Sequence, residues 1–553
     1  MSAARTWASI PELVADRASS APALVGYRFL SRTGEEDRLD YRTLHERAMA
    51  VAVRLREHAK PGDRVVVVLP PGIDFIVAIF GCLYAGVVAV PSAVPHGGRA
   101  ERRLDAVARI VADTEPAVVM TTPALQPALA AMKELRADVG WMTEFRACDA
   151  VHDPEAAAAG APAVIQYSSG STRAPRGVVL SQENLLANIA IIHQKFQTSR
   201  ESRGVIWLPP HHDMGLIGGV LGPVYGGFPV ILLSPVTFIH QPFRWLKAIS
   251  DTRATISGGP DFAYRLCVER VSAEQRMLLD LSCWDVAFSG AEPVRSATLD
   301  RFAATFAAQG FRRRAFFPCY GLAEATLFVT GPDSGPDRAV KPSRRGARVD
   351  CGSPAPDHEV RIVHPESLRP CRPGVIGEIW VRGPSVAARY WNDAAETART
   401  FGWTLNGQGP FLRTGDLGIV TGGRLHVTGR LKDVMLIGGQ KYWPEDVEDS
   451  LAGLDADLVA GGCAAFTIEV DGHERLAIVH EVDRRAPPQR HAALVDAIRR
   501  RVAEHWALPV HDVRLLKPGG LPRTTSGKPR RFMCRDGFAA STLDVWAPAE
   551  AAV

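Results

Sequence analysis

The chain reads Ala163-Val-Ile-Gln-Tyr-Ser-Ser-Gly-Ser-Thr-Arg-Ala-Pro-Arg-Gly-Val-Val-Leu-Ser181 about a third of the way along its length. Residues 163–167 and 178–180 are strand-like, so the hydroxyl- and glycine-rich loop between them joins strand to strand. Ser181 is a typical N-cap, and apolar residues follow it at helical spacing: Leu185, Ile189, Ile192 and Phe196. The stretch predicts strand, loop, strand and then helix.

The loop itself has the composition of a phosphate-binding turn. Backbone N–H groups and hydroxyls can wrap phosphate oxygens, and a nearby guanidinium adds charge. The candidate phosphate-binding residues are Ser168, Ser169, Gly170, Ser171, Thr172 and Arg176. The alternative is a solvated hairpin turn, but such turns usually need only about two to five residues, and this loop is longer.

A second candidate phosphate-facing piece is Pro522-Arg-Thr-Thr-Ser-Gly-Lys528, near the end of the chain. It is not a nucleotide triphosphatase P-loop, because prolines occupy positions 522 and 529, where that motif needs glycine and serine or threonine. The polar residues before Lys528 favour a turn that presents the lysine side chain. Because the two pieces lie so far apart in the chain, we expect two domains and a hinge.

Composition excludes several classes of protein. The chain has 553 residues, of which 46% are apolar, enough for a large core. A net charge of +4 and 22% charged residues do not favour a nucleic-acid partner. Its nine cysteines are scattered without a C-x-x-C pair, and the first residues lack the apolar core of a signal peptide. We therefore expect a reducing, cytoplasmic location.

Alternating apolar runs and helical patterns predict an α/β class. Residues 64–69 and 117–120 suit buried strands, and apolar residues between Phe75 and Leu83 recur at helical spacing. Residues 423–428 should complete a hairpin, after which a smaller pattern of strands and helices begins. We predict an N-terminal domain over 1–429 and a C-terminal domain over 430–553, which is near the usual domain size.

One uncharged segment, 215–236, is long enough to span a bilayer. It contains many glycines and prolines, which would interrupt a helix surrounded by lipid. Residues 229–233 suit a short buried strand instead. We expect this segment to belong to the core and predict no membrane span.

The chain resembles the adenylate-forming superfamily, and within it the fatty acyl-AMP ligases. Eight stretches in the same order carry the resemblance and together span most of the chain: Gln166 to Arg173, Trp207-Leu-Pro-Pro-His-His-Asp-Met-Gly-Leu-Ile217, Ser257 to Tyr264, Ser289-Gly-Ala-Glu-Pro-Val294, Tyr320-Gly-Leu-Ala-Glu-Ala-Thr326, Arg413 to Leu417, Gly429-Arg-Leu-Lys-Asp433 and Pro522 to Lys528. The resemblance implies a large N-terminal domain of parallel-type sheets layered with helices, a distorted small barrel, and a small mobile α+β C-terminal domain.

The resemblance also implies a reaction. A carboxylate would attack the α-phosphate of ATP to give acyl-AMP and pyrophosphate, with Mg²⁺ present. Two anions that approach within ~4 Å repel by about 4 kcal/mol at an effective dielectric near 20, so cations and oriented donors have to offset that repulsion. We expect Lys528 to do so from the C-terminal domain, while Glu324 ligates magnesium and Thr172 acts beside them.

Other roles follow from the same resemblance. Tyr320 would stack on adenine, Asp416 would accept hydrogen bonds from the ribose hydroxyls with Arg430 beside it, and Lys432 would be the hinge. Gly321 and the opposite wall complete the nucleotide site: Gly290, Ala291, Glu292 and Pro293. Each has a plainer alternative, such as a core tyrosine for Tyr320 or a hairpin-turn residue for Asp416.

The acyl pocket is expected around His212. The pair His211 and His212 could suggest a metal, but adjacent residues on a strand point to opposite faces, so we expect no metal there. A purely structural histidine is the alternative. The predicted pocket residues are His212, Asp213, Met214, Gly215, Ser257, Gly258, Phe262 and Ala323. The depth of this pocket would decide the size of the acid.

Two departures from the resemblance matter. Arg176 stands where relatives usually have lysine, which keeps the charge but changes its geometry. The interval from Val329 to Cys351 looks short for the insertion typical of fatty acyl-AMP ligases, which is associated with failure to use coenzyme A. We expect an acyl carrier protein as thiol acceptor. An acyl-CoA ligase on the same scaffold, or a non-catalytic acyl- or nucleotide-binding protein, are the alternatives.

Overall fold

The computed structural model describes residues 7–31, 34, 36–95, 100–146, 160–168, 175–333, 349–438, 440–471, 473–523 and 529–546. The chain divides into two compact units. The larger consists of Met1–Ser168, Arg176–Thr414 and Ile419–Val427, and the smaller includes Gly415–Gly418 and Thr428–Val553. The main break thus falls beside the hairpin strand at 424–430.

The first sheet of the larger unit has the strand order β13-β12-β11-β9-β10-β1-β2. Neighbouring strands are parallel throughout, except that β1 and β2 are antiparallel. The strands are β1 (Val25–Leu30), β2 (Glu36–Asp40), β9 (Gly204–Ile206), β10 (Val230–Leu233), β11 (Ile256–Gly259), β12 (Val286–Ser289) and β13 (Phe316–Pro318). Their short, almost wholly apolar sequences are those of strands buried on both faces.

The second sheet has the order β19-β8-β7-β4-β3-β5-β6. Its centre is parallel, whereas β8 is antiparallel to both β7 and β19. The strands are β3 (Arg64–Val67), β4 (Val88–Pro91), β5 (Val118–Met120), β6 (Gly140–Met142), β7 (Pro162–Ser168), β8 (Arg176–Ser181) and β19 (Arg389–Tyr390).

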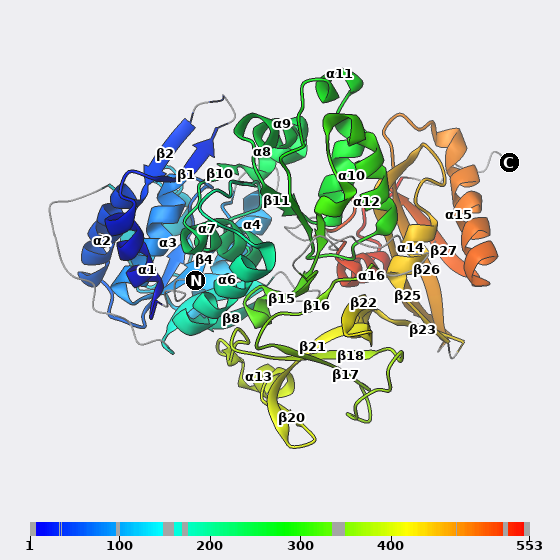
Figure 1. The fold of residues 1–553 in the computed structure, drawn as a ribbon. Helices are drawn as coiled ribbons and strands as arrows, with labels where there is room; N and C mark the ends of the chain where they lie inside the picture. The colour runs from blue at the N-terminus through cyan, green and yellow to red at the C-terminus, as the bar shows by residue number, and fades with distance from the viewer. Residues whose placement is uncertain are drawn as a thin grey trace. The chain divides into compact units, whose positions relative to one another are not determined.

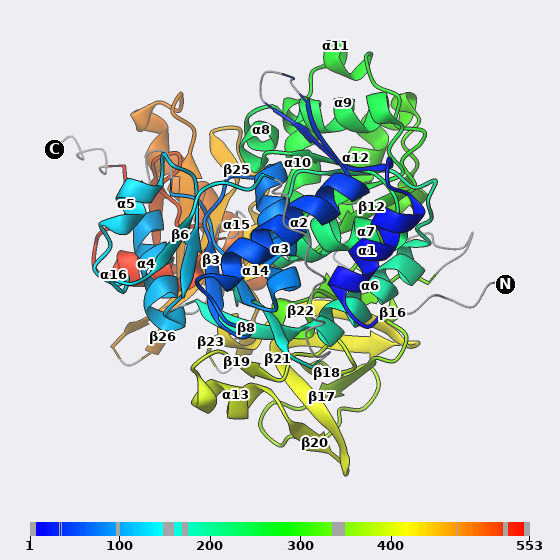
Figure 2. The same cartoon turned by 90° about the vertical axis from the view of Figure 1, so that its left-hand side faces the viewer.

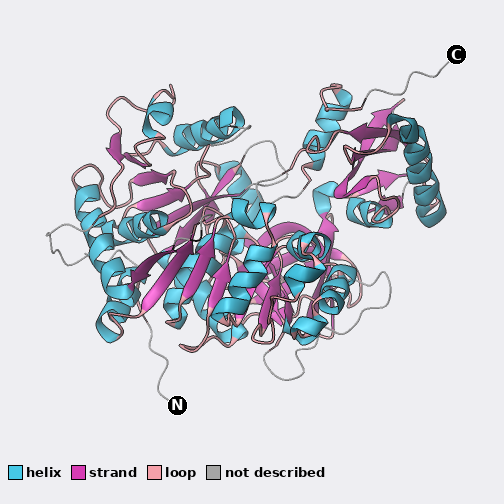
Figure 3. Cartoon of the chain, turned by 90° about the horizontal axis from the view of Figure 1, so that it is seen from above, coloured by secondary structure: helices cyan, strands magenta, loops and turns pink. Residues whose placement is uncertain are grey.

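Helices cover these sheets, as Figure 3 shows from above. In α3 (Ile73–Ala85) every residue except Asp74 is buried, so this helix is enclosed by the core rather than exposed on one face. Figures 1 and 2 show α3 side by side with α1 (Ile10–Ser20) and α2 (Tyr41–Arg56). The other helices of this unit are α4 (Ala100–Thr114), α5 (Gln126–Ala130), α6 (Gln182–Phe196), α7 (Gly222–Gly226), α8 (Pro235–His240), α9 (Phe243–Thr252), α10 (Asp261–Arg270), α11 (Ala273–Arg276), α12 (Ser296–Thr305) and α13 (Ala394–Thr400).

Smaller antiparallel sheets follow along the chain. One has the order β14-β15-β16, and another has the order β17-β18-β21-β20 with β22 paired to β21. Their bounds are β14 (Tyr320–Gly321), β15 (Phe328–Gly331), β16 (Ser353–Pro354), β17 (Glu359–Val363), β18 (Gly377–Arg382), β20 (Trp403–Leu405), β21 (Gln408–Thr421) and β22 (Arg424–Arg430).

The smaller unit is α+β. A three-stranded sheet is formed by β25 (Leu458–Val470), β26 (His473–Val482) and β27 (Val510–Leu516), with α15 (His491–Trp506) along it in Figure 1. Leu494, Ile498 and Val502 form the buried stripe of that helix at helical spacing. The remaining elements are the hairpin β23 (Met435–Ile437) and β24 (Gln440–Tyr442), α14 (Pro444–Ser450) and α16 (Arg531–Ala539).

The predicted class, strands and helix cap are confirmed. The class is α/β, and β7 and β8 are antiparallel neighbours on either side of the predicted loop. Ser181 caps α6 in a capping box, in which its hydroxyl accepts from the Asn184 N–H and the Asn184 side chain accepts from the Ser181 N–H. Residues 230–233 form the predicted short buried strand, β10. Among the described residues, no helix is long and apolar enough to cross a membrane.

The prediction that His211 and His212 lie on a strand is wrong. Strand β9 ends at Ile206, and the two histidines lie in the turn before a π-helix that begins at Met214. Their ring centroids are 4.6 Å apart, so the alternation expected of strand neighbours does not apply. Within the described ranges there is nevertheless no group of three His, Cys, Asp or Glu side chains arranged to hold a metal ion.

Candidate active site

A narrow, mostly apolar cavity runs through the larger unit beside the first sheet. It encloses about 80 Å³. A single water needs roughly 10–15 Å³ by the same measure, so the cavity has room for several groups of about that size. Its middle is lined by Ile192 and Phe196 of α6, Ile206 of β9, Gly218, Phe288 of β12 and Phe328 of β15.

Aromatic packing fixes the middle of this cavity. The Phe196 ring stacks on Phe288 at 5.9 Å between centroids, and it meets Phe317 at 4.7 Å and Phe328 at 6.3 Å edge to face. Aromatic pairs at these separations contribute roughly 0.5–1.5 kcal/mol each beyond their burial. Gly218 also lines the cavity, and a Cβ there would meet Leu327 at 3.5 Å, an ordinary van der Waals distance. The aromatic contacts therefore define one packed side of the cavity.

One end of the cavity, its mouth, carries residues that the sequence predicted for nucleotide binding. Gly290, Ala291, Tyr320 and Gly321 all line it. Ala291 has a positive φ of 66°, and a Cβ on Gly321 would come within 1.6 Å of the Leu327 carbonyl oxygen. Backbone geometry at both positions is therefore strictly determined. Tyr320 is buried and faces this mouth, which suits the predicted adenine stacking without testing it.

The loop after β12 is held by a carboxylate. Glu292 Oε1 accepts a 2.6 Å hydrogen bond from the Phe262 N–H, at the start of α10. Asp261 beside it accepts from the Arg295 N–H at the start of α12 and from the Thr298 hydroxyl. Thus Glu292, predicted as part of the nucleotide wall, connects that wall to a helix N-terminus, while its neighbour Pro293 is exposed.

Asp261 has an unusual environment. Its side chain is fully buried, and burial raises the pKa of its carboxyl to about 6 in spite of the nearby Arg295 guanidinium. The carboxyl is therefore expected to change its charge in mildly acidic solution.

Glu324, the predicted magnesium ligand, lies in a short 3₁₀ turn and is half-buried. The Tyr390 hydroxyl donates a 2.8 Å hydrogen bond to its Oε1. Burial first, and then the Glu324 carboxylate, raise the pKa of the Tyr390 hydroxyl well above its usual value, so the hydroxyl stays a proton donor. No sequence pattern points to Tyr390, because its contact with Glu324 depends on β19 joining the second sheet.

Tyr390 also connects Glu324 to Arg176, the predicted cation of the phosphate loop. Strand β19 pairs with β8, which begins at Arg176, and the Arg176 guanidinium lies 5.6 Å from the centre of the Tyr390 ring. Arg176 also pairs with Glu396 at 2.9 Å. The structure thus brings Arg176 and Glu324 to the same aromatic side chain.

Asp416 and Arg430, the predicted ribose-binding pair, are also brought together. Arg430 Nε lies 3.2 Å from Asp416 Oδ1, and Asp416 is buried. They come from the paired strands β21 and β22, whose pairing was predicted as a hairpin. Lys432 follows in a 3₁₀ turn and is exposed, as a hinge residue can be.

Of the residues predicted for the acyl pocket, Asp213 and Met214 line the cavity. Ser257 is turned into the core, where its hydroxyl accepts from Trp245 Nε1 at 2.8 Å and donates to the Val205 carbonyl. Gly258 packs closely, since a Cβ there would lie 2.2 Å from the Phe288 oxygen. The other six predicted pocket residues are described but do not line the cavity: His212, Gly215, Ser257, Gly258, Phe262 and Ala323. Their roles remain predictions.

Several predicted residues fall outside the described ranges: Ser169, Gly170, Ser171, Thr172 and Lys528. The backbone of Ser168 is the last of β7 and pairs with Arg176. Arg523, the last described residue before the segment 524–528, pairs with Glu481 at 3.2 Å. Predictions on the loop and on the catalytic lysine therefore stay predictions.

A partly buried cluster of charges lies within the smaller unit. Arg531, at the start of α16, pairs with Glu445 and Glu448 at 2.7 Å and with Asp433 at 3.1 Å. Asp433 directly follows Lys432. The cluster therefore connects the helix after the lysine segment to the predicted hinge within this unit.

Comparison with known proteins places the chain in a family. The sequence profile described as AMP-binding enzyme matches residues 12–391. The chain is 38% identical to the medium-chain-fatty-acid--[acyl-carrier-protein] ligase JamA of Moorena producens, over 98% of this chain and 96% of that protein. It is 34% identical to the long-chain-fatty-acid--AMP ligase FadD26 of Mycobacterium marinum, over 97% and 99%.

A solved structure agrees. The fatty acid AMP ligase from Legionella pneumophila superposes with a TM-score of 0.72 at 38% identity, and the match covers 98% of each chain. The resemblance drawn from the eight sequence stretches is thereby confirmed, and this chain belongs to the AMP-binding, adenylate-forming enzymes.

Proposed function

We propose that this protein is a fatty acyl-AMP ligase. It activates a fatty acid with ATP to acyl-AMP and pyrophosphate, and then transfers the acyl group to the phosphopantetheine thiol of an acyl carrier protein. The observation that carries the proposal is the apolar cavity whose mouth is formed by Gly290, Ala291 and Tyr320. A carboxylate at that mouth, with its alkyl chain inside, would lie beside the predicted nucleotide wall.

In the first step a carboxylate oxygen forms a bond to the α-phosphorus of ATP, and the bond from that phosphorus to the bridging oxygen breaks, which releases pyrophosphate. The attack brings two anions together, so the site must supply positive charge. Lys528 is assigned to this role on the sequence pattern. Arg176 is assigned to the departing phosphates, and the stacking of its guanidinium on Tyr390 supports a fixed orientation.

The residues present suit magnesium. Mg²⁺ prefers oxygen ligands and is usually bound through one or two carboxylates together with substrate phosphates. Glu324 supplies a half-buried carboxylate, and the hydrogen bond from Tyr390 to Oε1 fixes its orientation. When bound, the ion would neutralise charge on the phosphates. Asp416, paired with Arg430, is assigned to the ribose hydroxyls.

In the second step the carrier thiolate attacks the acyl carbonyl carbon, a thioester forms, and AMP leaves. We assign the acceptor to a carrier protein because the 38%-identical relative JamA is named as an [acyl-carrier-protein] ligase. Rotation of the smaller unit about Lys432 between the two steps is the hinge role proposed for that residue.

The test is direct detection of products. Purified protein is incubated with ATP, Mg²⁺ and a series of saturated fatty acids, and acyl-AMP is measured by mass spectrometry. Holo carrier protein or coenzyme A is then added separately. We expect acyl-AMP with at least one acid and thioester only with the carrier. Thioester formed on coenzyme A would contradict the acceptor, and absence of acyl-AMP with every acid would contradict the activity.

A further inference from the structure

The cavity runs from the carboxyl edge of the first sheet to its amino edge. Gly290, at the mouth, directly follows the last residue of β12, whereas Gly204, Val230 and Ile256 are the first residues of β9, β10 and β11. All four line the cavity, and the strands are parallel. The end lined by Gly204, Val230 and Ile256 is therefore opposite the mouth, and we call it the far end.

The register of the sheet gives the length of this path. Ile256 pairs with Val286, and Gly290 lies four residues further along the chain from Val286. Four residues of strand advance roughly 13 Å. Single bonds of about 1.5 Å laid out as a staggered zigzag cover that distance in roughly ten carbons. The path matches a medium-length alkyl chain.

The far end carries a pair of polar side chains in an otherwise apolar environment. His193, in the last turn of α6, and Thr198 both line the cavity, and the His193 Nδ1 and Thr198 hydroxyl share a hydrogen bond. Burial first, and then the charge of Arg17, lower the pKa of the His193 imidazole. The other polar lining residues Asp213 and Tyr320 belong to the mouth side, so this pair lies at the opposite end of the cavity.

The wall behind His193 is held in place. Its ring meets Tyr225 edge to face at 5.4 Å, and Arg17, which is buried, donates hydrogen bonds to the Tyr225 carbonyl at 2.6 Å and the Val224 carbonyl at 2.9 Å. These contacts connect α1, α6 and α7 behind the histidine.

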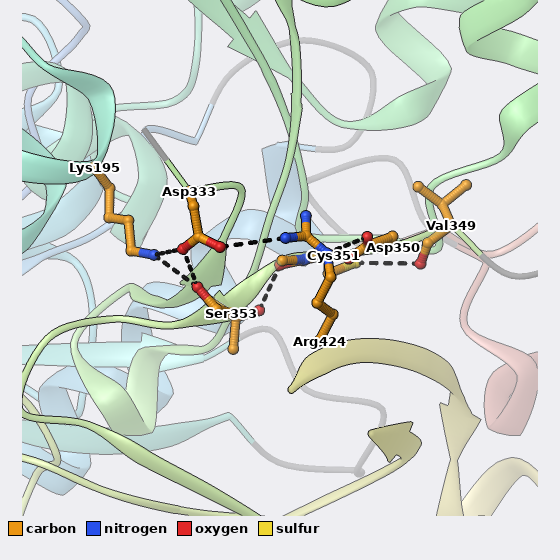
Figure 4. Close-up of polar contacts among 9 residues, drawn as sticks. Lys195, Asp333, Val349, Asp350, Cys351, Ser353 and Arg424 are labelled. Carbon is orange, nitrogen blue, oxygen red and sulfur yellow. Dashed lines mark hydrogen bonds and ion pairs between the residues drawn. The ribbon is translucent and has the colours of Figure 1, made fainter. Parts of the chain in front are cut away.

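The end of α6 is anchored as well, on another side. The ammonium of the buried Lys195 lies 3.0 Å from Asp333 Oδ1 and 3.0 Å from the Ser353 hydroxyl, and Arg424 contacts Asp333 at 3.3 Å and also pairs with Asp350. Figure 4 shows Lys195 and Arg424 approaching Asp333 from opposite sides. Lys195 lies between His193 and Phe196 in the chain, so this anchor fixes the helical turn that carries both cavity residues.

We propose that His193, held by Thr198, is the chain-length determinant of the acyl cavity, and that the preferred substrates are medium-chain fatty acids. This inference rests on the proposed function. A longer chain would have to break the hydrogen bond between the two side chains and displace a ring packed against Tyr225. A chain that ends before the pair loses no contact. The relatives named above include both a medium-chain and a long-chain enzyme, so family membership alone does not decide the length.

The test measures kcat/KM in ATP–pyrophosphate exchange for saturated acids from hexanoic to octadecanoic, with the full-length protein. We expect wild type to prefer octanoic to dodecanoic acid over hexadecanoic acid. His193→Ala should raise the ratio of kcat/KM for hexadecanoic to octanoic acid at least about tenfold, since a few methylenes in an apolar pocket discriminate by that amount or more.

Variants of Thr198 separate the effect of side-chain size from the effect of the hydrogen bond to His193. Thr198→Val keeps the size but removes the hydroxyl, and should shift the profile toward longer acids by a smaller factor than His193→Ala. Thr198→Leu adds bulk at a half-buried position and should shift the profile toward shorter acids. Gln194→Ala, on the exposed side of the same helical turn, is the matched control and should keep the wild-type ratio.

The outcomes distinguish the two proposals. Exchange with fatty acids whose length profile is the same in wild type, His193→Ala and Thr198→Leu would overturn the chain-length role alone, as would a wild type that prefers hexadecanoic acid. No exchange with any acid in wild type would overturn the proposed function, and this inference with it. If His193→Ala does not fold, the opposite shifts expected for the two Thr198 variants decide the question.

Discussion

At the scale of single residues, the site depends on side chains that orient others. Tyr390 is the clearest case, because its hydroxyl binds Glu324 and its ring carries Arg176. Partners that orient a metal ligand typically affect metal affinity or activity by about 10–100-fold. A sequence pattern marks Glu324 but not Tyr390, since the tyrosine lies 66 residues away and the contact exists only in the folded chain.

We predict that Glu324→Gln lowers fatty-acid-dependent exchange by at least about 100-fold, because the amide cannot replace a carboxylate at a hard cation. Tyr390→Phe should lower it by about tenfold and raise the Mg²⁺ concentration needed for half-maximal rate. Both effects are measured from the rate of ATP–pyrophosphate exchange as the magnesium concentration is varied. Tyr442→Phe, in the smaller unit, is the matched control. An unchanged magnesium dependence in Tyr390→Phe would exclude the orienting role.

Asp261 gives a prediction about stability and pH. The pKa of its carboxyl is about 6 in the folded protein, against about 3.9 in an unfolded chain. Between these values the folded state binds more protons, so this group lowers the free energy of unfolding as pH rises from about 4 to 6, by at most about 3 kcal/mol.

Asp261→Asn should therefore become more stable relative to wild type as pH rises from about 4 to 7, with little further change above about 7. Melting temperatures of both proteins at several pH values measure this difference. Asp285→Asn, at an exposed position, serves as control. If the difference in melting temperature between the two proteins is constant from pH 4 to 8, burial does not raise the pKa of the Asp261 carboxyl.

At the scale of elements, the sequence predicted what local patterns determine. Strands β7, β8 and β10 and the capped helix α6 follow from apolar runs, spacing and the Ser181 cap. The histidine turn was mistaken for a strand, because an apolar run before it does not show that β9 ends at Ile206. The acyl cavity was predicted only in part, since its lining among the described residues comes from nine helices and strands whose positions depend on packing.

The partly buried cluster around Arg531 gives a prediction at this scale. Arg531→Met leaves Glu445 and Glu448 without their main cationic partner, and removal of one partner from a buried ion pair typically costs about 3–5 kcal/mol. We expect faster amide hydrogen exchange in α14 and α16. Arg535→Met, on the exposed face of α16, should change stability by less than about 0.5 kcal/mol. Equal exchange in both variants would contradict a stabilising role for the cluster.

At the scale of the whole molecule, the proposed reaction uses residues of both compact units. The sequence predicted a boundary at 429/430, and the compact units meet in the chain near Val427 and Thr428. Superfamily membership could be predicted from eight ordered stretches, because the chemistry restricts which residues they contain. The chain length of the preferred fatty acid could not be predicted from the sequence. In the proposal above it depends on the position of His193 and Thr198 at the far end of the cavity.

The most direct measurement is fatty-acid-dependent ATP–pyrophosphate exchange in wild type and Lys528→Ala, with circular dichroism to show that both are folded. We predict exchange in wild type and a loss of at least about 100-fold in the variant, because the charge that offsets two approaching anions is removed. A folded Lys528→Ala protein that exchanges at the wild-type rate would contradict the proposal that this lysine drives adenylate formation.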